Sequence, residues 1–163
     1  MLKLPKFNLR GTTLVEVLVS VSIVAIVSIF VGVTVYQFSV VRNNILDDTK
    51  KLYLAEEAYE TIRFLRDVDW SNISGLTNNT RYYLQVSTTT VAIGGTSELI
   101  EDRFNRNFLV QPVYRNASGN IVASTTSGAS VDTDAKHLFI YVGDSKSTTT
   151  MQAILVNLPS WKF

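Results

Sequence analysis

One acidic residue inside an apolar stretch is the position with the clearest chemical meaning in this sequence. Glu16 is flanked on both sides by Leu and Val, and an ionised side chain at a bilayer centre costs on the order of 3 kcal/mol, less near the edge. If the chain is cut between Gly11 and Thr12, the new α-amino group lies about one helical turn before Glu16. At ~4 Å and an effective dielectric of ~20 their attraction is about 4 kcal/mol before desolvation. Pairing of Glu16 with a new amino terminus, in the same or a neighbouring chain, is therefore physically credible.

The residues before Glu16 favour a cut at this place. Lys3, Lys6 and Arg10 precede Gly11, and no acid lies among them. A secretory signal has an apolar core of roughly 7 to 15 residues and is cut after that core, whereas here the only persuasive small residue, Gly11, lies before the core. An ordinary removable export signal is therefore the weaker interpretation.

The apolar stretch itself is long enough to cross a membrane. No charged residue occurs from Val17 to Val41, and a helix over these residues spans about 37 Å, against a hydrocarbon core of about 30 Å. Basic residues are balanced on the two sides, since Arg42, Lys50 and Lys51 match the three of the leader. We expect the N-terminus inside, because the short leader carries no acid and because of the resemblance described next.

The stretch 10–19, RGTTLVEVLV, resembles the cleavage and methylation signature of type IV prepilins and type II secretion pseudopilins. The resemblance implies that a membrane-embedded prepilin peptidase cuts between Gly11 and Thr12 and methylates the new N-terminus at Thr12. It also implies that Glu16 registers a subunit on its neighbour during assembly. Two features depart from the family pattern, since Thr12 stands where Phe is usual and the apolar stretch has no Pro.

This resemblance implies a structural subunit, not an enzyme. The chain would be a pilin, minor pilin or pseudopilin, held single-pass in the cytoplasmic (inner) membrane and then moved into a cell-surface or periplasmic filament. Its partners would be the prepilin peptidase, copies of itself and other (pseudo)pilins, and the inner-membrane assembly platform. The alternative is a bitopic, signal-anchored membrane protein with an extracytoplasmic, β-rich binding domain.

Periodicity predicts an α+β fold. A basic leader, 1–11, precedes an apolar helix, 12–41, and an amphipathic continuation, 42–73, ended by the turn-favouring residues Ser71 to Gly75. The expected apolar face of the continuation is Ile45, Leu52, Tyr59, Ile62 and Leu65, opposed by Asp47, Lys51, Glu57 and Glu60. An antiparallel sheet domain, 74–163, should follow, with strands at 81–87, 107–115, 120–125, 136–142 and 151–158. Asn116 to Asn120 predicts a turn, and Pro112 an edge or bulge. The resemblance implies the same pilin-like plan, a long helix packed on the sheet.

Composition argues against catalysis and against nucleic-acid binding. The chain has no Cys and a single His137, and no nucleophile is placed beside a base. Fifteen Lys and Arg nearly balance fourteen Asp and Glu, with no basic stripe. His137, between apolar strand residues, is interpreted as a half-buried packing residue. We expect no cofactor.

Other polar candidates have simpler interpretations. Asp132, Asp134 and Asp144 could gather around calcium, but they are sparser than a calcium loop requires, so we expect no metal. Charges on the amphipathic half are interpreted as a solvated face more readily than as intersubunit salt bridges; these are Glu56, Glu57, Arg63, Arg66 and Asp67. Trp70 and the segment 161–163 are expected to anchor the helix end and the last strand to the core.

Overall fold

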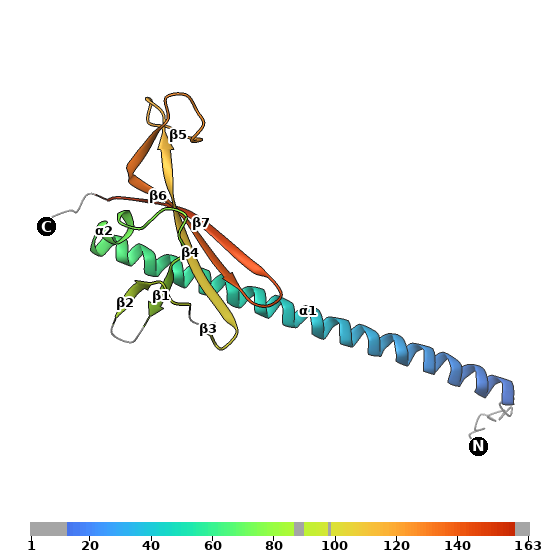
Figure 1. The fold of residues 1–163 in the computed structure, drawn as a ribbon. Helices are drawn as coiled ribbons and strands as arrows, with labels where there is room; N and C mark the ends of the chain where they lie inside the picture. The colour runs from blue at the N-terminus through green and yellow to red at the C-terminus, as the bar shows by residue number, and fades with distance from the viewer. Residues whose placement is uncertain (1–12, 87–89, 98, 159–163) are drawn as a thin grey trace, which may run out of the picture. The chain divides into compact units, whose positions relative to one another are not determined.

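A long helix followed by antiparallel sheets makes up the described chain. The computed structural model describes residues 13–86, 90–97 and 99–158. Its elements are α1 (Leu14–Val68), α2 (Ser71–Ser74), β1 (Tyr83–Val86), β2 (Val91–Gly94), β3 (Leu99–Ile100), β4 (Phe104–Arg115), β5 (Ile121–Val122), β6 (Ser130–Gly143) and β7 (Thr148–Val156) (Figure 1). The predicted α+β class, with one long N-terminal helix before antiparallel strands, is confirmed. The chain divides into two compact units, Met1–Leu46 and Asp47–Phe163.

The second unit is built on a sheet in the order β3-β4-β6-β7, with β5 paired to β4. All of its pairings are antiparallel, and β4, β6 and β7 run side by side (Figure 1). The strands β1 and β2 form a separate hairpin, tied to β4 by an isolated bridge between Tyr82 and Phe108.

The core of this unit lies between the second half of α1 and one face of the sheet. Ala55, Ala58 and Ile62 recur at helical spacing and are fully buried in one cluster with strand residues of β4, β6 and β7. Burying a large aliphatic side chain contributes roughly 1.5–3 kcal/mol, and the two alanines keep the facing side of the helix small. The sheet contributes Phe108, Val110, Leu138, Ile140, Val142 and Leu155.

The predicted apolar face of the amphipathic half is wrong at three positions. Lys51, assigned to the wet side, is 1% exposed, whereas Ile45 and Leu52, assigned to the apolar side, are 60% and 45% exposed. The large aliphatic residues guided the sequence prediction, but the buried stripe is set by the small Ala55 and Ala58. Lys51 lies on that stripe. Its ammonium group pairs there with Asp144 and donates a hydrogen bond to Ser147, both from a distant part of the chain.

Helix α1 ends earlier than the sequence predicted. It stops at Val68 rather than at residue 73, and the short α2 follows. The side chain of Asp69 accepts a hydrogen bond from the backbone N–H of Ser71 at 2.8 Å. This local bond competes with continuation of the helix, and it also lowers the pKa of Asp69.

The long strands lie where period-two patterns predicted them. The predicted bulge and the predicted turn are also present. A register shift between Pro112 and Val113 confirms the predicted bulge, since Pro has no N–H for the ladder. At the predicted turn, the N–H of Asn116 donates to the carbonyl of Asn120 at 3.0 Å, and Gly119 has a φ of 80°. The strands β2 and β3 were not predicted, and β5 covers only two of the six residues expected.

Candidate functional site

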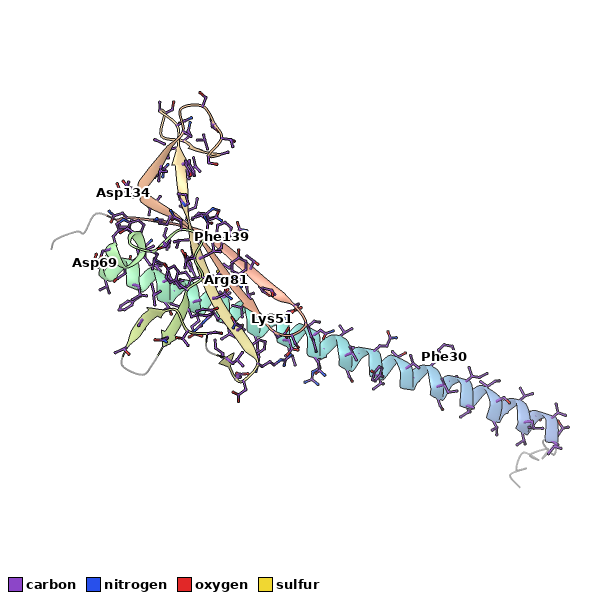
Figure 2. All side chains as sticks on the ribbon, viewed as in Figure 1. Phe30, Lys51, Asp69, Arg81, Asp134 and Phe139 are labelled. Carbon is purple, nitrogen blue, oxygen red and sulfur yellow. The ribbon has the colours of Figure 1, made fainter. Side chains whose placement is uncertain are left out.

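The candidate site is the apolar part of α1, whose side chains are exposed rather than packed into the core of the described chain. Every residue from Thr13 to Leu46 is exposed, including large side chains such as Phe30, which is 69% exposed (Figure 2). A contiguous apolar surface of this kind marks a membrane or protein interface. By length and composition α1 could cross a membrane once.

Five serine and threonine hydroxyl groups within this stretch donate hydrogen bonds to the helix itself. Ser20, Ser22, Ser28 and Thr34 each donate to the carbonyl four residues earlier at 2.8 Å, and Ser39 does so at 3.0 Å. In a bilayer, polar groups must find partners inside the protein. These residues therefore place no unpaired donor on the surface of the helix.

Glu16 lies in the first turn of α1, and Thr13 caps that turn. The backbone N–H of Glu16 donates to the carbonyl of Thr13 at 2.9 Å, with Thr13 Oγ1 at 3.4 Å. A carboxylate in the first turn of a helix is stabilised by the helix dipole by about 0.3–1 kcal/mol. The position of Glu16 in the first turn of α1 therefore favours its charged form.

Thr13 was missed by the sequence analysis, although a signal was present. The spacing Thr13-x-x-Glu16 is that of a capping box. The predicted cleavage residues, Gly11 and Thr12, lie outside the described residues. The structure therefore brings together Glu16 and Thr13 but does not address the cut itself.

A second group of functional interest is a buried ionic cluster that joins α1 to the sheet in the second unit. Lys51 Nζ lies 3.0 Å from Asp48 Oδ1 and 3.7 Å from Asp144 Oδ1, and it donates to Ser147 Oγ. Arg103 lies 3.4 Å from Asp144 Oδ2. The carboxylate of Asp144 therefore pairs with both Lys51 and Arg103, and its side chain is 1% exposed.

Hydrogen bonds within the β6–β7 turn hold Asp144 in its ionised form. Its Oδ1 accepts the backbone N–H groups of Ser147 at 2.9 Å and Lys146 at 2.8 Å. These bonds lower the pKa of Asp144 from 3.8 to about 2, assisted by Lys51 and Arg103. Arg103 also pairs with Asp47 and lowers the pKa of that carboxyl.

The three aspartates considered for calcium do not come together. Asp132 and Asp134 lie in the first half of β6, whereas Asp144 follows its other end. Asp132 pairs with Arg115, which lowers its pKa, and Asp134 Oδ1 accepts a bond from the Asn157 amide at 3.0 Å. Within the described ranges, no group of three or more His, Asp or Glu side chains could hold a metal ion.

Other polar candidates pair within the chain. Glu57 Oε2 lies 3.1 Å from Nη1 of the buried Arg106, and Arg66 pairs with Asp67 at 2.7 Å.

His137 is half-buried with its ring 4.2 Å from that of Phe139, as predicted for a packing residue. Trp70 packs against the core, as expected. The segment 161–163 lies outside the described residues.

Comparison with protein-family models, with curated proteins and with solved structures gave no match.

Proposed function

We propose that this chain is a structural subunit, a pilin, minor pilin or pseudopilin, of a type IV pilus-like or type II secretion filament. It is processed after Gly11 and assembles through its N-terminal helix. The observation that carries the proposal is the stretch from Thr13 to Leu46, exposed along its whole length and bearing one carboxylate in its first turn. The Gly-Thr-Thr-Leu-Val-Glu order around that carboxylate supports the same reading.

The physical logic is an exchange of lipid contact for helix packing. In the membrane the apolar part of α1 lies against lipid, and in a filament it lies against the same part of neighbouring subunits. Because lipid tails are as apolar as the helix, the exchange depends on packing and on polar pairing. Glu16 supplies the polar pairing, with the amino group of Thr12 that exists only after the cut.

The alternative function is that of a signal-anchored membrane protein with a binding domain. The same exposed helix serves both functions, so the helix does not separate them. The presence of Glu16 favours assembly, because an anchor without partners gains nothing from an acidic side chain in its apolar stretch.

Processing is tested with paired glycine variants. Gly11→Ala should leave uncut precursor on a membrane blot, because the cleavage position is lost. Gly32→Ala is the control, since a methyl group added at Gly32 meets no atom within 4 Å. Normal trimming of Gly11→Ala refutes the processing step.

Assembly is tested with paired carboxylate variants. Glu16→Gln keeps the size of the side chain and removes its charge, so it should be cut normally but yield far fewer filaments. Glu56→Gln is the control, an exposed acid on the same helix beyond its apolar part. Equal filament yields from Glu16→Gln and the wild type remove the role assigned to Glu16.

A further inference from the structure

The main sheet of the second unit ends in the strand β7, and no further strand pairs with β7 in the part of the chain that the structure describes. The order of the sheet is β3-β4-β6-β7, so β7 lies on the far side of β6 from β4 (Figure 1). An edge strand presents a row of unpaired backbone N–H and C=O groups, with which a strand of another chain can pair.

Two hydrogen bonds at the ends of β7 show which of its backbone groups point outward. The N–H of Asp144 donates to the carbonyl of Ser147 at 3.0 Å, and the N–H of Asn157 donates to the carbonyl of Asp134 at 2.8 Å. Residues that exchange hydrogen bonds with the partner strand alternate with residues that do not, so the odd-numbered residues of β7 bond to β6. The even-numbered residues direct their N–H and C=O groups away from β6. They are Thr148, Thr150, Gln152, Ile154 and Val156.

This edge lacks the features that usually keep edge strands from pairing, which are charged residues, Pro and bulges. Residues 148–156 include no Lys, Arg, Asp, Glu or Pro, and their register with β6 is continuous. On the other side of the sheet, β4 carries Pro112 with a register shift beside it, and its partners β3 and β5 have two residues each. The sheet therefore has one interrupted edge and one long, regular, uncharged edge.

The core is also incompletely covered along β7. Three residues of β6 are fully buried, namely Leu138, Ile140 and Val142. The β7 residues opposite them are only half-buried, although opposite residues point to the same face of a sheet; they are Ala153, Met151 and Thr149. A further strand beside β7 would cover these side chains.

We propose that β7 pairs with β7 of a second copy of this chain, antiparallel and centred on Gln152. With this centre the whole strand overlaps its copy, and Thr148 lies opposite Val156. Thr and β-branched residues are favoured in strands, and no like charges meet because β7 carries none. Among the described strands, β1, β2, β3 and β5 have four residues or fewer. None of them matches the length of the free edge of β7, so the copy of β7 is the best-fitting partner.

The symmetry of this pairing defines where the second copy comes from. The same edge is used by both copies, so the contact closes at two. Its two-fold axis is perpendicular to the sheet and reverses the direction of the second half of α1, which packs on the sheet. Copies side by side in one membrane share one direction. The contact therefore joins copies from two membranes or, under the proposed function, from two filaments.

Single cysteines test the register, because the chain has no Cys of its own. Hydrogen-bonded residues opposite each other have Cα atoms about 5.5 Å apart, which a disulfide can bridge. With full chains held one per lipid nanodisc, Gln152→Cys should form disulfide-linked dimers, because residue 152 faces itself. Thr148→Cys should not do so alone, since its two copies lie about 27 Å apart along the strands.

A mixture of Thr148→Cys and Val156→Cys should give the mixed dimer, because these positions face each other. Failure of Gln152→Cys to cross-link overturns the proposal. Equal cross-linking by Thr148→Cys alone overturns it as well.

A charge variant tests the contact without a covalent bond. Gln152→Lys places two like charges opposite each other and should raise the dissociation constant of the disc pairs at least about fivefold in sedimentation velocity. Gln85→Lys is the control, the same change at an exposed residue of β1, and should stay within about twofold of wild type. Equal pairing by Gln152→Lys and wild type overturns the assignment. Neither result bears on processing after Gly11.

Discussion

Two neighbouring lysines differ sharply in their surroundings, and this difference gives a direct test of the ionic cluster. Lys50 has a side chain that is 53% exposed and pairs with Glu101, which is 62% exposed. Lys51 has a side chain that is 1% exposed and lies among Asp48, Asp144 and Ser147. Replacing each lysine by Met removes the charge and keeps an unbranched side chain of similar length.

The expected losses of stability differ several-fold. Removing one partner of a buried ion pair costs about 3–5 kcal/mol. Lys51→Met should lie near 3 kcal/mol, since Asp144 keeps Arg103 and two backbone N–H groups. An exposed pair contributes about 0–1 kcal/mol, which sets the limit for Lys50→Met.

Urea unfolding in detergent, followed by circular dichroism and by tryptophan fluorescence, measures both variants. With an m-value of about 2 kcal/mol/M, the midpoint for Lys51→Met should fall by about 1.5 M and that for Lys50→Met by less than about 0.5 M. Equal midpoints for the two variants, or a Lys51→Met midpoint within about 0.2 M of wild type, refute the reasoning.

Three further predictions follow from the core, the helix cap and the turn after β6. Phe108→Ala should cost about 3–5 kcal/mol in urea unfolding, because Phe108 is 1% exposed in the core; a loss below about 1 kcal/mol contradicts its placement. Thr13→Val should speed amide exchange at Glu16 about two- to fivefold by NMR while leaving Val24 unchanged, since the cap contributes about 0.5–1 kcal/mol; unchanged exchange at Glu16 would mean that Thr13 is not the cap. The folded-state pKa of Asp144 is lowered to about 2, so its contribution is complete above about pH 4 and is lost as the pH falls toward 2. Wild-type stability should therefore fall more steeply over that range than that of Asp144→Asn, and parallel profiles would contradict the hydrogen bonds from Ser147 and Lys146.

Features that depend on neighbouring residues were predictable from the sequence. The period of the apolar residues located α1 and the long strands β4, β6 and β7, because side-chain direction repeats at fixed intervals along each element. The bulge at Pro112 follows from its missing N–H, and the turn at Gly119 from its freedom at positive φ.

Features that depend on distant residues were not predictable. From the sequence, Lys51 is predicted to lie on the surface. The Ser147 hydroxyl that accepts its hydrogen bond lies 96 residues further along the chain, so no local pattern indicates the contact. The strand β2 is short, and its pairing with β1 and the packing of Ile93 against the core both depend on distant residues. The burial of Asn107 Oδ1 without a hydrogen-bond partner among the described residues is likewise visible only in the folded chain. The alternation of β4 indicates only that this residue points outward.

The intact mass of the protein purified from its native membrane tests the central claim most directly. We predict a chain that begins at Thr12, with or without one methyl group on its amino terminus, and that therefore lacks residues 1–11. A mass that includes Met1, or one that places the first residue anywhere other than Thr12, contradicts the pairing between the new amino terminus and Glu16 on which assembly is proposed to depend.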